Sequence, residues 1–149
     1  MRLLRAGQRS TPPLNCGVKR LVETVPQVRM HREKFALVRL SVDDPMPDWL
    51  GGKFWSFIRS PGGVSIFCAS SLAPDAVVHS KEWCCFELLR SSVSHADGYL
   101  SALATSLRSV QADLFVISAV ENDYFFCRTN ELGSVLGVLN RDGYLITYD

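Results

Sequence analysis

The sequence predicts an α/β (α+β) fold of the split βαβ, or ferredoxin-like, type, and its second half carries the clearest signal. Between Gly98 and Gln111, leucines and a valine recur at three- and four-residue steps, which places them on one helix face. Two short aromatic and β-branched runs follow, separated by a polar turn, as in a hairpin. A second amphipathic segment and a closing apolar run then complete the order strand, helix, strand, strand, helix, strand.

Each element of this half follows from local signals. Asn130 can cap the second helix, and Arg141-Asp142-Gly143 ends it. The polar Glu121-Asn122-Asp123 forms the hairpin turn, in which the two acids are turn formers rather than an acid/base pair. The expected elements are strand 83–89, helix 98–111, strands 114–117 and 124–127, helix 130–139 and strand 144–148.

The first half is predicted to contain strands but no long helix. We expect strands at 35–40, 54–59 and 64–68, with a turn or short helical piece at 43–49. Ser60-Pro61-Gly62-Gly63 is typical of a hairpin, since glycine supplies positive φ. Residues 71–80 lack a helical period. The first half thus resembles the second with its helices reduced to loops, which suggests a degenerate internal duplication with antiparallel sheets.

The first 34 residues have the composition of a basic, disordered tail. They hold eight lysines and arginines against two glutamates, about +6, whereas the remaining eight basic and thirteen acidic residues give −5. An organellar transit peptide, or a functional start at Met30, are alternatives. We therefore expect a tail at 1–34, a first module at 35–82 and a second at 83–149.

Composition excludes several classes of function. An acidic folded part is a poor match for a phosphate backbone, so no nucleic-acid partner is expected. No stretch approaches the roughly 20 apolar residues of a membrane span, so a soluble, cytoplasmic protein is expected. The chain has neither Gly-x-x-x-x-Gly-Lys nor Gly-x-Ser-x-Gly, so no enzyme and no cofactor are expected.

The five cysteines lack the spacing of a disulfide framework or a metal site. We expect four of them to be reduced thiols packed in apolar strands of an intracellular protein: Cys68, Cys84, Cys85 and Cys127. A cysteine nucleophile with His79 or His95 remains as an alternative, and it would require one strand thiol to be activated. His95 has no second ligand at metal spacing, so no metal is expected.

A set of short motifs, in order, resembles one family. It comprises Leu37-Val38-Arg39-Leu40, Pro47-Asp48-Trp49, Phe54-Trp55-Ser56-Phe57-Ile58-Arg59, Val64-Ser65-Ile66-Phe67-Cys68, Trp83-Cys84-Cys85-Phe86, Gly98-Tyr99-Leu100, and Ile117-Ser118 followed by Asp123-Tyr124-Phe125-Phe126. This order, from about Phe35 to Tyr148, resembles the small tandem ACT-like proteins, relatives of the cytosolic arginine sensors of animal cells.

The resemblance implies two ferredoxin-like ACT modules side by side, the first with reduced helices, and no catalytic machinery. It also implies a free amino acid bound between modules and, in some members, a protein partner. The chain departs from the family's pattern at Gly63, at Ser118-Ala119-Val120 and at Asn122. These positions belong to the loops that the family links to ligand and partner contact, Ser118 among them.

The expected ligand site is the loop that opens the first long helix. Free N–H groups at a helix start favour a carboxylate, and Gly98 allows close approach. The loop residues are Ser94, His95, Ala96, Asp97 and Gly98, and the resemblance adds Asp113 and Leu114. Simpler roles are a helix N-cap for Asp97, a solvated loop position for His95 and a strand start for Asp113.

The sequence therefore predicts a non-catalytic, ACT-like regulatory protein that binds an amino acid. The alternative is a protein-interaction module with a vestigial pocket, which forms dimers through its sheet edges.

Overall fold

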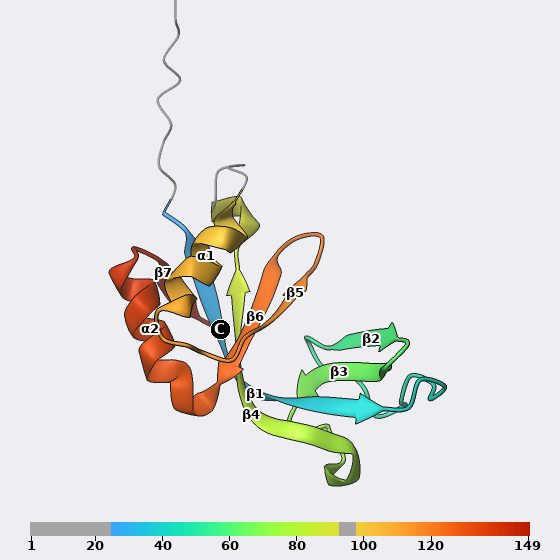
Figure 1. Ribbon diagram of the computed structural model, residues 1–149. Coiled ribbons are helices and arrows are strands. Elements are labelled where there is room, and N and C mark those ends of the chain that lie inside the picture. The colour runs from blue at the N-terminus through green and yellow to red at the C-terminus, as the bar shows by residue number, and fades with distance from the viewer. Residues whose placement is uncertain (1–24, 93–97) are drawn as a thin grey trace, which may run out of the picture.

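The computed structural model describes residues 25–92 and 98–149, and its framework is one curled, seven-stranded sheet (Figure 1). The strand order is β2-β3-β1-β4-β6-β5, with β7 on β1. Every pairing is antiparallel except that of β1 with β7. The strands are β1 (Gln27–Leu40), β2 (Ser56–Ser60), β3 (Gly63–Ala69), β4 (Val78–Leu88), β5 (Phe115–Ser118), β6 (Asp123–Arg128) and β7 (Leu145–Tyr148).

Two long strands run through both halves of the molecule. β1 pairs with β4 from Val28 opposite Leu88 to Val38 opposite Val78, with irregular register between Met30 and Lys34. Towards its end β1 also pairs with β3, and near its start with β7. In Figure 1 these two strands connect the helical part of the molecule with the β2–β3 part.

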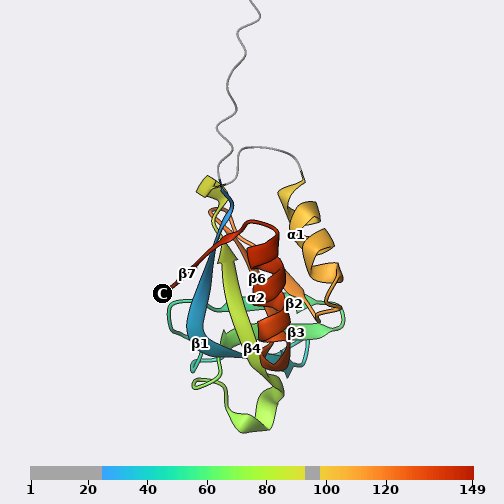
Figure 2. The same cartoon turned by 90° about the vertical axis from the view of Figure 1, so that its left-hand side faces the viewer.

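Two helices cover one face of the second half. They are α1 (Tyr99–Arg108) and α2 (Leu132–Arg141), and Figure 2 shows α2 in front of the strands with α1 beside it. Leu103 and Leu107 of α1, and Val135 and Leu139 of α2, are buried against Phe86 and other strand residues. The predicted helical periods, the hairpin and the closing strand are therefore confirmed, because each periodic face has the sheet that it needs.

The opposite face of the sheet carries an aromatic core that depends on the curl. Phe67 of β3 stacks on Phe126 of β6 at 4.4 Å and lies 5.2 Å from Phe115 of β5, measured between ring centroids. Trp83 and Phe35 are buried in the same cluster. β3 and the β5–β6 hairpin, which lie on opposite sides of the β1–β4 pair in the strand order, thus meet through their aromatic side chains.

Loops cover the other face of the first half. Ala36, Val38, Val64 and Ile66 form a third buried cluster, and Trp49, Leu50 and Val77 pack on it. Residues 41–55 and 70–77 contain no α-helix, only turns and the short 3-10 helix η1 (Asp75–Val77). The expected lack of a long helix in the first half is confirmed, whereas its origin as a reduced copy of the second half, and a two-module arrangement, stay predictions.

The hairpin between β2 and β3 has the predicted turn. Ser60 pairs with Gly63 across Pro61 and Gly62. Gly63 holds the positive φ, +127°, and a Cβ there would lie 2.9 Å from the carbonyl oxygen of Leu40. The second glycine of the motif is therefore the one that the fold requires.

The boundary predicted at residue 35 differs from the strand that the structure contains. β1 begins at Gln27, so residues 27–34, assigned to the tail, belong to the sheet. Side chains in this segment alternate between the two faces of the sheet: Val28 and Met30 face the helices, whereas Arg29 pairs with Glu87 on the other face. Consequently β7 pairs with β1 rather than with β4, its expected neighbour in a split βαβ unit. The many basic residues made the strand pattern of this segment difficult to recognise in the sequence.

Both predicted helix caps also differ from the structure. The 3-10 turn η3 (Thr129–Glu131) precedes α2, and the Glu131 carboxylate, not Asn130, accepts a hydrogen bond from the Arg128 backbone N–H. Gly98, not Asp97, stands at the N-cap position of α1. Asp97 lies outside the described residues.

Two further observations concern the whole described chain. Within residues 25–92 and 98–149 no helix has the length and apolar character needed to cross a bilayer. Cys68, Cys84, Cys85 and Cys127 are buried, as predicted, and are free thiols. Cys16 lies outside the described residues.

The structural role of residues 27–34 can be tested with one pair of matched variants. Val28 is fully buried, so Val28→Ala should lower the free energy of unfolding by about 2 kcal/mol, because two methyl groups lose their burial. Val25 is 55% exposed, and Val25→Ala should change it by less than about 0.5 kcal/mol. If urea denaturation shows equal, small changes in the free energy of unfolding for both variants, residues 27–34 do not pack in the sheet and belong to the tail.

Candidate functional site

The structure describes four of the eight predicted site residues, Gly98, Asp113, Leu114 and Ser118. Ser94, His95, Ala96 and Asp97 lie outside the described residues. The described positions form two groups rather than one. Gly98 precedes Tyr99, which contacts Asp123 opposite Ser118, whereas Asp113 and Leu114 precede the other end of β5. The four described residues therefore do not line one pocket together, and the loop site at residues 94–98 stays a prediction.

Gly98 has the properties that the site prediction requires of it. It precedes α1 with φ +111°, and a Cβ built there would meet nothing within 4 Å. Having no side chain, Gly98 cannot itself cap the first-turn N–H groups of α1. A ligand could approach this backbone closely, but a branched residue at position 98 would strain it.

A buried acid anchors the start of α1 to the β5–β6 hairpin. Asp123 is 1% exposed, and it accepts hydrogen bonds from the Tyr99 hydroxyl and from the Arg90 guanidinium, the latter at 3.3 Å. Arg90 also donates to Tyr99 Oη and to the Val120 carbonyl oxygen, each at 3.1 Å. The assignment of Asp123 as an exposed turn former is therefore wrong.

Asp123 also explains the role of Ser118. Burial alone would raise the pKa of the Asp123 carboxyl, but hydrogen bonds from Ser118 and Tyr99, together with the Arg90 charge, hold that pKa below its usual value. Ser118 is thus a partner of Asp123 at the end of the hairpin. The sequence offered no signal for this cluster, because Arg90 and Asp123 are 33 residues apart.

A second buried acid, Glu87, lies on the sheet face opposite the helices. It accepts hydrogen bonds from Arg29 at 3.0 Å, Asn122 at 2.7 Å and Tyr124 at 3.2 Å. His31 lies 3.9 Å from it and also contacts Asp149. Both oxygens of Glu87 therefore have partners, as expected of a structural network rather than of a catalytic base.

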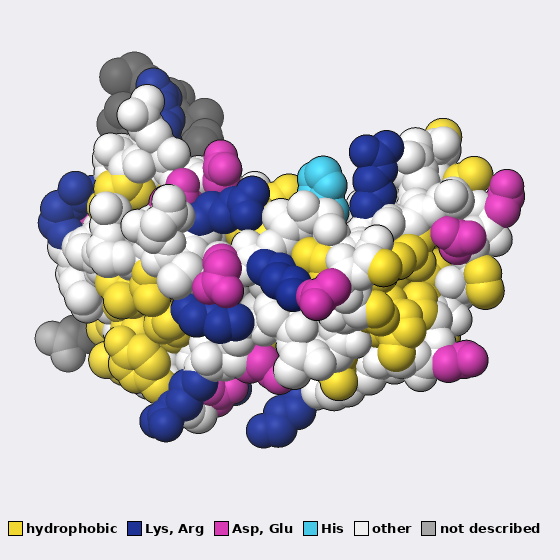
Figure 3. All heavy atoms as spheres, turned by 90° about the horizontal axis from the view of Figure 1, so that it is seen from below, with side chains coloured by type: hydrophobic (Ala, Val, Ile, Leu, Met, Phe, Trp, Pro, Cys, Tyr) yellow, Lys and Arg dark blue, Asp and Glu magenta, His cyan; other side chains and the backbone are white. Residues whose placement is uncertain are grey.

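Asp113 and Leu114 lie elsewhere, by an open groove of mixed charge. The Asp113 backbone N–H donates to Glu131, and the Asp113 carboxylate lies 4.0 Å from Arg128. Leu114 packs on the helical core. The groove lining is Lys81, Glu82, Asp113, Arg128, Thr129, Asn130 and Glu131. Figure 3 shows acidic and basic side chains interspersed over the lower face, with no single-sign patch there.

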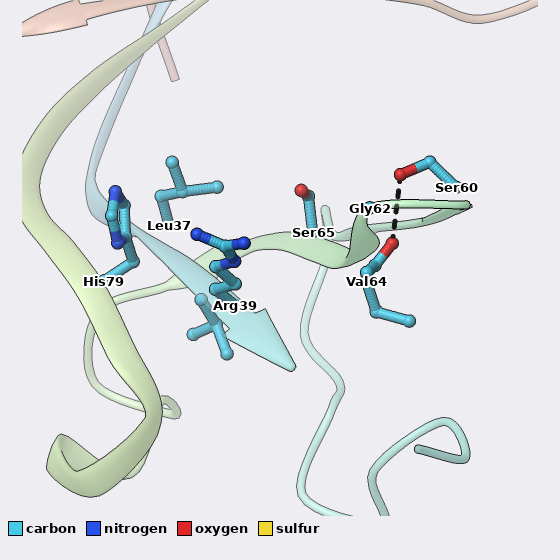
Figure 4. A pocket seen from close by; sticks show the side chains of 9 residues that line it. Leu37, Arg39, Ser60, Gly62, Val64, Ser65 and His79 are labelled. Atoms are coloured by element: carbon cyan, nitrogen blue, oxygen red, sulfur yellow. Dashed lines mark hydrogen bonds between the residues drawn. The ribbon is translucent and has the colours of Figure 1, made fainter. Parts of the chain in front are cut away.

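A cavity that the sequence did not predict lies in the first half. It measures about 230 Å³. Figure 4 shows Arg39, Ser65 and His79 rising on the same side of this sheet. The lining has no acid, and within the described residues Arg39 has no ion pair or hydrogen bond. The one signal was Arg39 itself, a cation at the end of the apolar run that starts at Phe35.

The described residues offer no metal centre, because no group of three or more His, Cys, Asp or Glu side chains converges among them.

Comparisons with solved structures identify the fold. Protein Atu0741 of Agrobacterium tumefaciens is similar with a TM-score of 0.77 and 24% identity, over 83% of this chain and 93% of that one. Vibrio cholerae VC0802, a protein of unknown function described as a possible transport protein, gives 0.66 and 18%, over 79% and 90%. No protein-family model and no curated protein matches the sequence.

Aspartate kinases supply the more distant neighbours. Escherichia coli aspartokinase III gives a TM-score of 0.54 at 11% identity, over 78% of this chain and 34% of the enzyme. A putative C-terminal regulatory domain of aspartate kinase from Porphyromonas gingivalis gives 0.52 at 10%, over 80% and 98%. These are ACT-type regulatory domains, so the chain has an ACT-like fold.

The anchor at Asp123 can be tested by removing one hydroxyl group. Tyr99→Phe should lower the free energy of unfolding by about 1.5 kcal/mol, since the buried carboxylate loses a donor. Tyr148 is 57% exposed, so Tyr148→Phe is the matched control and should have an effect below about 0.5 kcal/mol. Indistinguishable urea midpoints would mean that Tyr99 does not support Asp123.

Proposed function

We propose that this chain is a non-catalytic regulatory protein that binds a free amino acid. The observation that carries the proposal is the ACT-like fold, which it shares with regulatory domains of aspartate kinase. The E. coli neighbour is a complex with aspartate and ADP. A free amino acid is therefore the first ligand class to test. The absence of catalysis is supported by the partners that hold both buried acids, Glu87 and Asp123.

The proposed site is the segment between β4 and α1, residues 94–98. An amino acid has a carboxylate, to which the first-turn N–H groups of α1 can donate hydrogen bonds next to Gly98. Arg90 lies on the other side of the segment, and its side chain is 41% exposed. Its guanidinium is held by Asp123, Tyr99 and the Val120 carbonyl oxygen, so the N–H groups of α1 carry the proposed carboxylate contact.

A screen of the twenty amino acids by thermal unfolding tests the function. A ligand at a hundredfold excess over its Kd adds roughly 2.7 kcal/mol of stability, or roughly 5–10 °C in Tm for a chain of this size. We expect at least one amino acid to reach such a shift at millimolar concentration. If none of the twenty raises Tm, the binding proposal fails.

The position of the site can be tested with matched variants that carry the same type of substitution. Ala96→Glu adds a negative charge to the proposed loop and should weaken the best ligand at least tenfold, about 1.4 kcal/mol by calorimetry. Ala104→Glu, on an exposed position of α1, should leave the affinity within twofold. Arg39→Gln tests the cavity of Figure 4, and a loss of affinity there alone would move the site to the first half.

The alternative function is a protein-interaction module. It is favoured by exposed apolar side chains at both outer strands of the second half: Phe115 and Val116 on β5, and Leu145 and Tyr148 on β7. Within the described residues, neither strand has a partner on its outer edge, and such edges can pair with a second chain. A dimer in sedimentation analysis, together with no Tm shift for any amino acid, would favour this alternative.

A further inference from the structure

Three side chains form a row across the centre of the sheet. Lys34 on β1 is opposite Cys84 on β4, and Cys84 is opposite Cys127 on β6. Both cysteines belong to the core under the helices, with exposed fractions of 1% and 0%. The row therefore places a cation next to one thiol and a second thiol on its other side.

Polar contacts distinguish Cys84 from an ordinary buried cysteine. Lys34 Nζ lies 3.1 Å from Cys84 Sγ and 3.4 Å from the Thr129 hydroxyl oxygen. Thr129 Oγ1 is 3.6 Å from the same sulfur and donates to the Glu82 carbonyl oxygen at 2.9 Å. An ammonium group in direct contact with a sulfur favours the thiolate.

The two thiols differ in protonation. A hydrogen bond from the Cys127 thiol lowers the pKa of Cys84, and Lys34 and Thr129 lower it further, against the effect of burial. The pKa of Cys127 is raised, because its proton is held by the neighbouring thiolate and because it is buried. These shifts favour a thiolate at Cys84 and a protonated thiol at the opposed Cys127, the arrangement of a nucleophile and a resolving group.

The other two buried cysteines provide internal controls. Burial raises the pKa of Cys68 to about 11, and burial together with the Glu87 charge raises the pKa of Cys85. Neither has a cation among the groups that shift its pKa. At neutral pH both are protonated and unreactive.

We propose that Cys84 and Cys127 are an oxidisable pair that a hydroperoxide converts into a cross-strand disulfide. The Cys84 thiolate attacks the peroxide oxygen, which gives Cys84 sulfenic acid and hydroxide from hydrogen peroxide. The Cys127 sulfur then attacks the sulfenic sulfur, and its proton leaves with the hydroxyl group as water. From the thiolate–thiol state the protein loses two electrons and one proton, and the peroxide becomes one water and one hydroxide, which takes up a proton from the solvent.

The geometry permits both steps with small movements. Directly opposed residues of an antiparallel pair have Cβ atoms about 4.5–5.5 Å apart, whereas a disulfide needs about 3.5–4.5 Å, so β4 and β6 must approach slightly. Thr129 lines the open groove beside Asp113 and contacts Cys84. The thiolate is thus one side chain away from solvent, within reach of a molecule as small as hydrogen peroxide.

The test uses the reduced full-length chain and hydrogen peroxide at equimolar amounts. We expect an intact mass lower by two hydrogens and, in a non-reducing digest, a link between the peptides that contain Cys84 and Cys127. Cys84 and Cys85 are adjacent and occur in the same peptide. Cys85→Ala should form the link at the parent rate, which would show that Cys84 is the linked residue. Cys84→Ala should not form it, and Cys127→Ser should accumulate a sulfenic acid that dimedone traps.

The lysine gives a readout that a purely structural role would not produce. Lys34→Met should slow the oxidation at least tenfold at pH 6.5, where a thiol of ordinary pKa is only about 1% ionised, and the difference should narrow towards pH 9. Lys34→Arg should restore most of the rate. Far-UV circular dichroism of each variant confirms that it is folded.

Several outcomes would overturn the proposal. One is oxidation that falls equally on Cys68 and Cys85, and another is a link that forms only in denaturant. A rate that is insensitive to Lys34→Met at every pH, in a folded variant, would equally overturn it. None of these outcomes bears on amino-acid binding, because the thiol row is independent of the proposed ligand site.

Discussion

The pairing of β1 with β4 is the constraint on which the rest of the structure depends. It extends from Val28 opposite Leu88 to Val38 opposite Val78. β3, β6 and β7 pair directly with one of these two strands, and β2 and β5 join the sheet through β3 and β6. Its bends allow the sheet to curl, and the curl brings Phe67 onto Phe126. Irregular register marks these bends, as expected where a long strand must change direction. The helix-covered core and the aromatic core are therefore two faces of one framework.

The sequence correctly predicted those features that depend on interactions between residues close together in the chain. The period of Leu103 and Leu107 and the Pro61-Gly62-Gly63 turn each lie within a few residues, and the structure has both the helix and the hairpin. Residues 27–34 were missed because their strand identity comes from β4 and β7, whose residues lie more than forty positions away. A basic composition typical of a solvated tail is compatible with a strand when its polar side chains have partners, as Arg29 has in Glu87 and His31 has in Asp149.

The candidate site was less predictable than the fold, for the same reason. Asp123 follows a polar turn, so composition alone favours exposure, yet Arg90 and Tyr99 allow it to be buried. Burial of an unpaired carboxylate would be costly, and the arginine contact removes that cost. Asp113 and Ser118 are only five residues apart in sequence, but an extended strand separates their surroundings. Proximity along the chain was therefore a poor guide to a shared pocket.

The register of β1 against β4 twice places a cation of β1 opposite an acidic or ionisable side chain of β4, with different chemical results. Arg29 is opposite Glu87 on the aromatic face, and Lys34 is opposite Cys84 on the helical face. A carboxylate is ionised at any neutral pH, so its partner cation makes a stable, inert pair. A thiol is normally protonated, so the same kind of partner changes its charge state and with it its nucleophilicity. Cys127 is the next residue in the row, so a second thiol lies beside the activated Cys84 and can react with it once Cys84 is oxidised.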